Sequence, residues 1–286
     1  MRILSLTLVL CMCAGCCAEL TAQAPEYETT RIADGVYQFR YRTHNAFFVI
    51  AGDGVVAVDP ISVEAASRYV QEIRRVAPGA KLHAVVYSHD HADHATGANV
   101  LRRELGPDAP IIAHVAAHAK IAAASNPDLP PPTLTFSDRL ALHFGGRVIE
   151  LHYLGKSHSD NMIVVLLPAE RIAFAVDFVS NDRVGFRDLP DYYFPDLFDA
   201  LARLEQLPFD RIVFGHGPPG DKRAVVRQRR YYADLREAVE QAVRRGLSED
   251  QAAREVRLPQ YESWGGYGDW FPLNVRAMYR WLASQR

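Results

Sequence analysis

Six consecutive positions, 89 to 94, carry three histidines and two aspartates directly after an apolar run. Neutral imidazole binds zinc and several other transition metals, and carboxylate oxygens accompany it readily. Residues two apart in an extended segment point to the same side, so His89 and His91 can bind one metal. Asp93 and His94 follow as the chain turns into a helix, and they point toward a neighbouring position. This segment therefore predicts a metal site with room for two ions.

Each metal needs ligands from elsewhere, and two later histidines follow predicted strands. His158 follows the run RVIELHYL, and His216 follows the run RIVF. Asp177 ends the apolar run RIAFAVD, where a carboxylate is costly unless it faces a compensating charge such as two cations. Asp59 likewise ends the run VVAVD, and it can accept a hydrogen bond from a metal-bound imidazole.

The remaining histidines and Asp90 receive a different interpretation. Asp90 is expected to be either a solvated carboxylate or one that supports a ligand. Surface or satisfied core positions are expected for the other histidines, which are His44, His83, His114, His118, His143 and His152.

The segments that must position these side chains are strands and helices in alternation. Several short runs from about residue 27 predict strands, with Gly52-Asp53-Gly54 as a hairpin turn. Ser62 predicts the N-cap of a helix, and the run ATGANVLRREL after the histidine motif predicts another. The proline-rich segment 126–133 predicts a loop. The histidine motif thus lies between a buried strand, LHAVVYSH, and a helix.

A second run of strands, with the helix DLFDALARLEQL, follows that loop. Two runs of strands with helices between them predict two sheets packed face to face, with helices outside. The expected fold class is α+β, a four-layer αββα sandwich of two mixed β-sheets, over residues 27–220. Residues 221–286 predict a helical C-terminal extension packed on this domain, with a cap at Asp221 and a capping box of Ser248 and Gln251.

Composition excludes some classes of partner. The 286 residues contain 32 Lys and Arg against 34 Asp and Glu, which gives a formal net charge of -2 without a long run of either sign. A nucleic-acid binder would carry a basic surface, so no nucleic-acid partner is expected. The expected partner is a small-molecule substrate.

Residues 1–24 have the pattern of a signal peptide. Arg2 precedes an apolar run that is too short for a comfortable membrane span, and small residues follow. All four cysteines lie in this segment, so the mature chain would offer neither a disulfide nor a thiolate ligand. One alternative is a lipid anchor at Cys16, and the other is ordinary cleavage after Ala24. Either predicts an exported protein, periplasmic or secreted.

The motif at 89–94, followed in order by His158, Asp177 and His216, resembles the metallo-β-lactamase-fold superfamily. Its flanks agree, with NAFFVIAGDGVVAVDP before the motif, ATGAN after it and a closing strand followed by Gly-His-Gly. The resemblance covers about residues 34–217.

The resemblance implies a ligand assignment. His89, His91 and His158 would hold a first metal ion. The second would be held by Asp93, His94 and His216, with Asp177 bridging the two. Two zinc ions per chain are expected, and Asp93 and Asp177 are the candidate catalytic residues.

Zinc lowers the pKa of a bound water toward 7, so hydroxide is available at neutral pH. The resemblance therefore implies a zinc-dependent hydrolase of ester, thioester, lactone or amide carbonyls, β-lactams included. The zinc β-lactamases with a Cys ligand would have it at the position of Asp177, and the branch with a Lys soon after that ligand would have it at the position of Ser180. This chain differs from both branches. The bridging Asp fits thioesterases and lactonases better, although lactonases with a Tyr soon after it would have to use Tyr192 or Tyr193.

Two other classes of protein remain as alternatives. Persulfide dioxygenases of the same superfamily keep a similar motif but use one iron, so iron is the alternative metal. The other class is a metal-binding protein without catalysis. A structural zinc site closes at four ligands, however, and the larger set of candidate ligands here favours a catalytic site. The walls of the pocket are expected from the loop after Asp177, from 126–133 and from the aromatic residues of the tail. Lys156, Arg183 and Arg187 are either anion-binding residues or solvated charges.

Overall fold

The computed structural model describes residues 25–285 of the chain. The predicted signal peptide, residues 1–24, and its lipid-anchor candidate Cys16 lie outside the described residues. Within that range, the structure has no helix long and apolar enough to cross a membrane.

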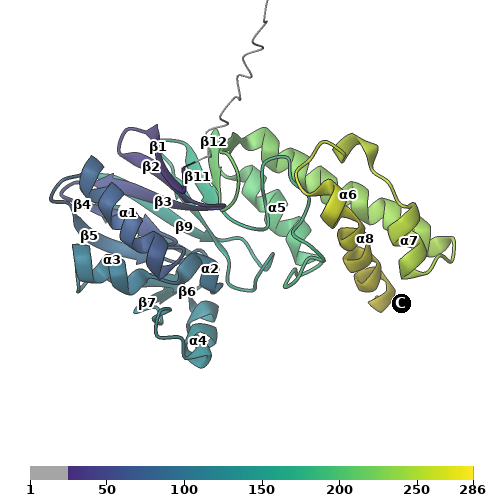
Figure 1. Ribbon diagram of the computed structural model, residues 1–286, viewed down its shortest axis with the longest axis horizontal. Helices are drawn as coiled ribbons and strands as arrows, with labels where there is room; N and C mark the ends of the chain where they lie inside the picture. The colour runs from purple at the N-terminus through teal and green to yellow at the C-terminus, as the bar shows by residue number, and fades with distance from the viewer. Residues whose placement is uncertain (1–24, 286) are drawn as a thin grey trace, which may run out of the picture.

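Two mixed β-sheets form the centre of the part of the chain that the structure describes (Figure 1). The first sheet has its strands in sequence order: β1 (Tyr27–Ala33), β2 (Val36–Tyr41), β3 (His44–Ala51), β4 (Gly54–Val58), β5 (Lys81–Val86), β6 (Ile111–His114) and β7 (Leu134–Phe136). The second runs in the order β13 (Gly220–Asp221), β12 (Arg211–Phe214), β11 (Ile172–Ala175), β10 (Ile163–Leu167), β9 (Arg147–Tyr153) and β8 (Arg139–Phe144). Strands β4 to β7 pair in parallel, and so do β11 and β12.

Helices lie outside the sheets and in the C-terminal extension. They are α1 (Val63–Val76), α2 (Ala92–Ala95), α3 (Ala98–Leu105), α4 (Val115–Ala124), α5 (Asp196–Gln206), α6 (Lys222–Arg244), α7 (Glu249–Glu255) and α8 (Tyr267–Ser284). Helices α1 and α3 cover the first sheet, whereas α6, α7 and α8 lie at the opposite end of the molecule (Figure 1). Helix α5 packs on α6, and α6 packs on α8. The predicted sandwich with outer helices and a helical tail is confirmed.

Alternate side chains of β3 enter two different apolar clusters. Phe47 points into the core between the sheets, where its ring stacks on Phe174 of β11 at 5.4 Å between centroids. Phe48 points the other way, toward Tyr69 of α1 at 5.6 Å. Both faces of the first sheet are therefore buried, as expected for a strand with a two-residue period between two apolar layers.

Several predicted caps are present in the structure. Ser62 Oγ accepts a hydrogen bond from the backbone N–H of Ala65 at 3.0 Å and begins α1. Asp221 caps α6, and Ser248 with Gln251 forms the capping box of α7. These local predictions are confirmed because a cap depends on residues only two or three positions apart.

The helix predicted after the histidine motif is interrupted. Helix α2 ends at Ala95, and α3 begins only at Ala98, after Gly97 with a φ of 102°. A Cβ at Gly97 would approach the carbonyl oxygen of Ser62 to 2.6 Å, so the close packing on the start of α1 requires glycine. The break leaves His94 on its own short helix.

The strand ends bring distant segments to one edge of the sandwich. Asp59 and Ser88 follow the parallel strands β4 and β5, while Asp177 and His216 follow the parallel strands β11 and β12. Carboxyl ends of parallel strands meet at the same edge of a sheet. A bridge between His44, which begins β3, and His216 joins the two sheets at this edge.

Candidate metal centre

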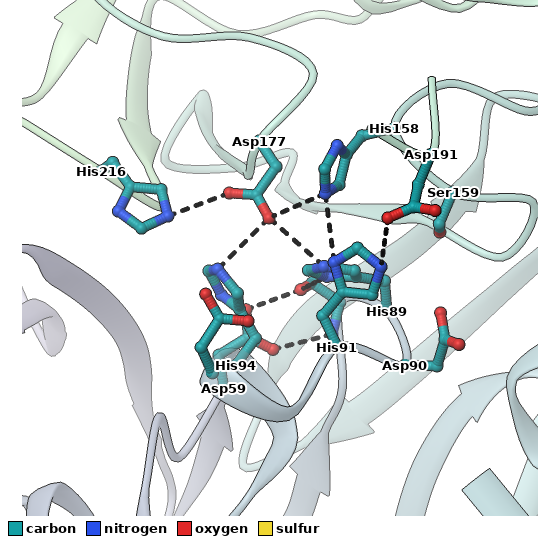
Figure 2. A network of polar contacts seen from close by, with 12 residues as sticks. Asp59, His89, Asp90, His91, His94, His158, Ser159, Asp177, Asp191 and His216 are labelled. Carbon is teal, nitrogen blue, oxygen red and sulfur yellow. Dashed lines mark hydrogen bonds and ion pairs between the residues drawn. The ribbon is translucent and has the colours of Figure 1, made fainter. Parts of the chain in front are cut away.

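Histidine and aspartate side chains converge at this edge of the sandwich (Figure 2). Within the described chain they form three overlapping groups, each with its possible ligand atoms within 4.8 Å of one another. The groups are His89, His91, His158 and Asp177; His94, Asp177 and His216; and His44, Asp93 and His216. Asp177 belongs to the first two groups, and His216 to the last two.

The first group is buried except for His91, whose side chain is 29% exposed. His89 Nε2 lies 3.2 Å from Asp177 Oδ2, and His158 Nε2 lies 3.7 Å from the same oxygen. His158 Nε2 also lies 3.1 Å from His91 Nδ1. Three imidazoles from two loops thus direct nitrogen atoms to one place beside a carboxylate, which is a suitable donor set for one metal ion.

The second group uses both oxygens of the Asp177 carboxylate. His94 Nε2 lies 3.3 Å from Oδ2, and His216 Nε2 lies 3.2 Å from Oδ1. Because Oδ2 also faces the first group, the carboxylate lies between the two sets of histidines (Figure 2). This is the position that a bridging ligand requires.

Asp93 lies beside this second group with a partner of its own. Its Oδ2 accepts a hydrogen bond from His44 Nε2 at 3.1 Å, and both residues group with His216. The ring of His44 contacts that of His216 edge-on, at 4.6 Å between centroids. His44 therefore holds one oxygen of Asp93 at the edge of the donor cluster.

Neighbouring groups fix the orientation of the imidazole rings. His94 Nδ1 donates to Asp59 Oδ2 at 3.0 Å, and Asp59 itself accepts two hydrogen bonds from Ser88, from the backbone N–H at 2.8 Å and from Oγ at 2.6 Å. His216 Nδ1 donates to the carbonyl oxygen of Thr43 at 2.9 Å. A hydrogen bond at Nδ1 leaves Nε2 free as the ligand atom, so these contacts select the tautomer that binds a metal.

Burial and neighbouring charges give the histidines different acidities. Burial lowers the pKa of His158 to about 3, and burial with the nearby His89 lowers the pKa of His91. Burial acts the same way on His94, but the carboxylates of Asp177 and Asp59 outweigh it and raise the pKa of His94. For Asp177, burial is likewise outweighed by His94 and other histidines, which lower its pKa.

The cluster fits a metal centre. The buried atoms His89 Nε2, His94 Nε2 and Asp177 Oδ1 have no hydrogen-bond partner among the described residues. Unsatisfied buried polar atoms are costly, and here they face one another instead of solvent. Imidazole nitrogen and carboxylate oxygen together suit zinc, and they also suit iron.

A cavity of about 450 Å³ opens beside the cluster. The lining residues that reach it from the donor groups are His44, His91, Asp93, His158, Asp177 and His216. Its opposite wall comes from the loop after β11 and from Trp270 of α8. Two of the predicted sources of the wall therefore line this cavity, but none of its described lining residues comes from 126–133, so that part of the prediction is wrong.

A family model described as the metallo-beta-lactamase superfamily matches residues 40–216. This range contains the candidate ligands and most of both sheets. The chain belongs to the metallo-beta-lactamase superfamily. The C-terminal extension of this superfamily member, which supplies Trp270, lies outside the matched range.

A curated relative and two solved structures resemble this superfamily member. The 2,4-dinitroanisole O-demethylase subunit alpha of Nocardioides sp. (strain JS1661) is 33% identical over 189 residues, which are 65% of this chain and 54% of that protein. The chain thus spans about half the length of the curated relative it matches. A metallo-beta-lactamase from Pontibacter korlensis has a TM-score of 0.62 at 22% identity, covering 70% of this chain and 95% of that one. The stereoselective inverting sec-alkylsulfatase from Pseudomonas sp. has a TM-score of 0.70 at 18% identity, covering 89% and 50%. Both structures support the metallo-beta-lactamase fold alone.

The structure adds His44 to the residues that the sequence indicated. All seven candidate ligands gather at the cluster, with Asp59 behind His94. His44, interpreted from the sequence as a surface or core residue, instead lines the cavity and binds Asp93. In the sequence, the only indication of a role for His44 is its position at the start of a predicted strand. Its place at the site depends on a bridge to His216, which joins segments far apart in the chain.

Other candidates from the sequence lie around the site. Asp90 Oδ1 accepts a hydrogen bond from Asn161 Nδ2 at 2.7 Å, so this carboxylate is tied to the loop of His158. The Tyr192 hydroxyl donates to the backbone carbonyl of Asp177 at 2.7 Å, and this bond supports the loop of that ligand. Lys156 and Arg187 are not among the described residues that line the cavity, whereas Arg183 is.

Proposed function

We propose that this chain is a metal-dependent hydrolase that holds two zinc ions and cleaves ester, thioester, lactone or amide carbonyls. One observation carries the proposal: the Asp177 carboxylate lies between two groups of histidines, and each group includes a buried Nε2, of His89 or of His94, without a hydrogen-bond partner among the described residues. A structural zinc site is closed by four ligands of its own. The cluster here instead shares Asp177 between two groups of histidines and opens to a cavity.

Bound zinc would supply an activated water at neutral pH and would polarise the carbonyl of the substrate. His89, His91 and His158 would hold one ion, and Asp93, His94 and His216 the other, with Asp177 between them. Burial opposes the ionised form of Asp93, but the hydrogen bond from His44 and the nearby His94 hold the pKa of Asp93 well below its usual range, so Asp93 stays ionised and could serve as a ligand that His44 keeps in place. The apolar wall of the cavity orients the substrate and excludes water.

Metal analysis of the purified protein tests the proposal. We expect about two zinc ions per chain and hydrolysis of 4-nitrophenyl esters, with both lost in His89→Ala and His158→Ala. His118→Ala is the matched control, because His118 is exposed on α4, away from the cluster. One iron per chain with oxygen uptake on persulfides would contradict the proposal and support a dioxygenase instead.

The curated relative suggests a second reaction. Its name describes the O-demethylation of 2,4-dinitroanisole, and the cavity of this chain has aromatic residues in its wall. We propose as the second candidate the hydrolysis of an electron-poor aryl methyl ether, in which water and the ether give a phenol and methanol. Release of 2,4-dinitrophenolate from 2,4-dinitroanisole, without consumption of oxygen, would support it. No release by a zinc-loaded protein that hydrolyses esters would exclude it.

A further inference from the structure

One wall of the cavity contains none of the candidate metal ligands. It is formed by the loop after β11 and by the start of α8, and its apolar members are Val179, Val184, Phe186, Pro190 and Trp270. Phe186 is 45% exposed, and its ring meets that of Trp270 edge-on at 5.0 Å between centroids. This wall can receive an apolar or aromatic part of a ligand.

A fixed positive charge is built into the same wall. Of the described residues that line the cavity, Arg183 alone is a lysine or arginine. Its guanidinium lies over the Trp270 ring, with Cζ 4.5 Å from the centroid, and its stem passes Gly265. The Val184 N–H donates to the Gly265 carbonyl at 3.1 Å, which ties the backbone beside Arg183 to the C-terminal extension. The cation is thus held in place by stacking and by backbone pairing.

Arg183 is half-buried and has no anionic partner. Across residues 25–285 its guanidinium makes no hydrogen bond or ion pair, and burial lowers its pKa without any carboxylate to oppose the effect. Two acidic residues near Arg183 in the sequence pair with other cations, Asp182 with Arg227 at 2.6 Å and Asp188 with Arg280 at 3.5 Å. Asp191, which lines the same cavity, lies 3.8 Å from His91. Arginine nevertheless stays charged. A partly desolvated cation without a partner is costly, and it points to a ligand that supplies the missing charge.

We propose, building on the hydrolase function above, that Arg183, held in place by its stacking on Trp270, binds a carboxylate of the substrate. The substrate class is then an ester or related acyl compound with an apolar body and a carboxylate remote from the scissile bond. A guanidinium offers two parallel N–H groups to the two oxygens of a carboxylate, and a single cation matches a singly charged group. Arg183 lies within the family match and Trp270 outside it, so the C-terminal extension supplies one of the two side chains of this subsite.

Two esters of equal length test the subsite in the metal-loaded enzyme. One is 4-nitrophenyl hexanoate, and the other is mono-4-nitrophenyl adipate, whose acyl chain ends in a carboxylate instead of a methyl group. We expect Arg183→Gln to lower kcat/KM for the adipate ester about 10- to 100-fold, mainly through KM. Hydrolysis of the hexanoate should stay within about twofold, since that ester makes no charged contact. Arg183→Lys should lose less, because the charge remains.

Arg187→Gln is the matched control, since Arg187 lies over Phe186 but outside the described cavity lining. It should leave both esters unchanged. An equal loss on both esters in Arg183→Gln, or no loss on the adipate ester, would overturn the subsite while leaving the hydrolase function intact.

Calorimetry with 4-phenylbutyrate provides a readout that needs no turnover. We expect its Kd to rise about tenfold in Arg183→Gln. Metal content must be equal in the two proteins, because carboxylates also bind metals directly. If neither ester is hydrolysed but this difference in Kd is found, the hydrolase proposal fails and the subsite stands. Equal binding by wild type and variant overturns the subsite whatever the turnover shows.

Discussion

The two groups of donors that share Asp177 differ in their neighbouring carboxylates and not in their burial. Each group combines a fully buried histidine with one that reaches the cavity: His89 is 0% and His91 29% exposed in the first, and His94 is 0% and His216 27% exposed in the second. In the second group His94 has a further buried carboxylate, Asp59, at 3.0 Å, whereas in the first group the exposed Asp191 lies 3.8 Å from His91. Both groups therefore meet the cavity, and the second holds more buried negative charge.

The groups also differ in the protons they hold without metal. His158 and His91 have lowered pKa values, so these imidazoles are neutral at neutral pH and ready to bind a metal. The raised pKa of His94 means that a metal must displace a proton there. Asp177 thus contributes to two different metal sites. The first group is ready to bind a metal, whereas the second must first lose a proton, so we expect the first group to bind its metal more tightly.

Asp177→Asn should produce the largest effect, because it removes the charge that both groups share. We expect loss of the second metal and a fall in ester kcat/KM of about a thousandfold, as several kcal/mol of charge stabilisation disappear. Metal analysis and steady-state kinetics measure both. Asp188→Asn is the control, since this exposed carboxylate of the same loop pairs with Arg280 at 3.5 Å and is not among the described residues that line the cavity. Two metals retained in Asp177→Asn would contradict a shared carboxylate.

Asp59→Asn should separate the two groups. Asp59 orients His94 directly and raises its pKa, and it reaches the first group only through Ser88, whose Oγ lies 3.0 Å from His89 Nδ1. We expect the Kd of the second metal to rise about 10- to 100-fold, as for other residues that orient metal ligands. Competition with a chelator measures the two affinities. Equal weakening of both metals would show that the groups are not independent.

The pH dependence of metal binding should differ between the groups. Below the raised pKa of His94, each unit of pH decrease should weaken the second metal about tenfold, because one proton competes with it. His158, with a pKa of about 3, stays neutral in this range, so the first metal should depend less on pH. Calorimetry in buffers of different ionisation enthalpy counts the protons released. Equal release for both metals would remove the difference proposed here.

His44→Ala should have the smallest effect. It removes one hydrogen bond to Asp93, and we expect the second metal to bind up to about tenfold more weakly while the first is unchanged. His44→Gln can still donate and should restore part of the affinity. His152→Ala is the control, because His152 pairs with Glu150 on β9 at 2.8 Å. Weaker binding of the first metal in His44→Ala would contradict the assignment of His44 to the second group.

Most of the fold could be predicted because its signals are local. The turn at Gly52-Asp53-Gly54 and the cap at Ser62 each involve a few adjacent residues, and both occur where expected. The break at Gly97 could not be predicted, because it depends on how closely the backbone approaches the carbonyl of Ser62. An apolar helical pattern continues across that break in the sequence.

The candidate site shows the same division. His89 and His91 could be paired from their spacing, and His158 and His216 from their places after strands. His44 was missed because it lies 49 positions from Asp93 and has no motif around it. Arg183 was only one of three candidate cations until its stacking on Trp270 and its missing partner were visible.

By itself the sequence determined the chemical types of the donors and their local order, since alternation and strand ends follow from backbone geometry. Only the tertiary structure decided that Asp177 lies between two histidine groups and that Asp93 lies beside His44. It also decided that the C-terminal extension completes the cavity. These outcomes depend on how segments far apart in the chain pack together, and side-chain contacts across such distances have no periodic signal in the sequence.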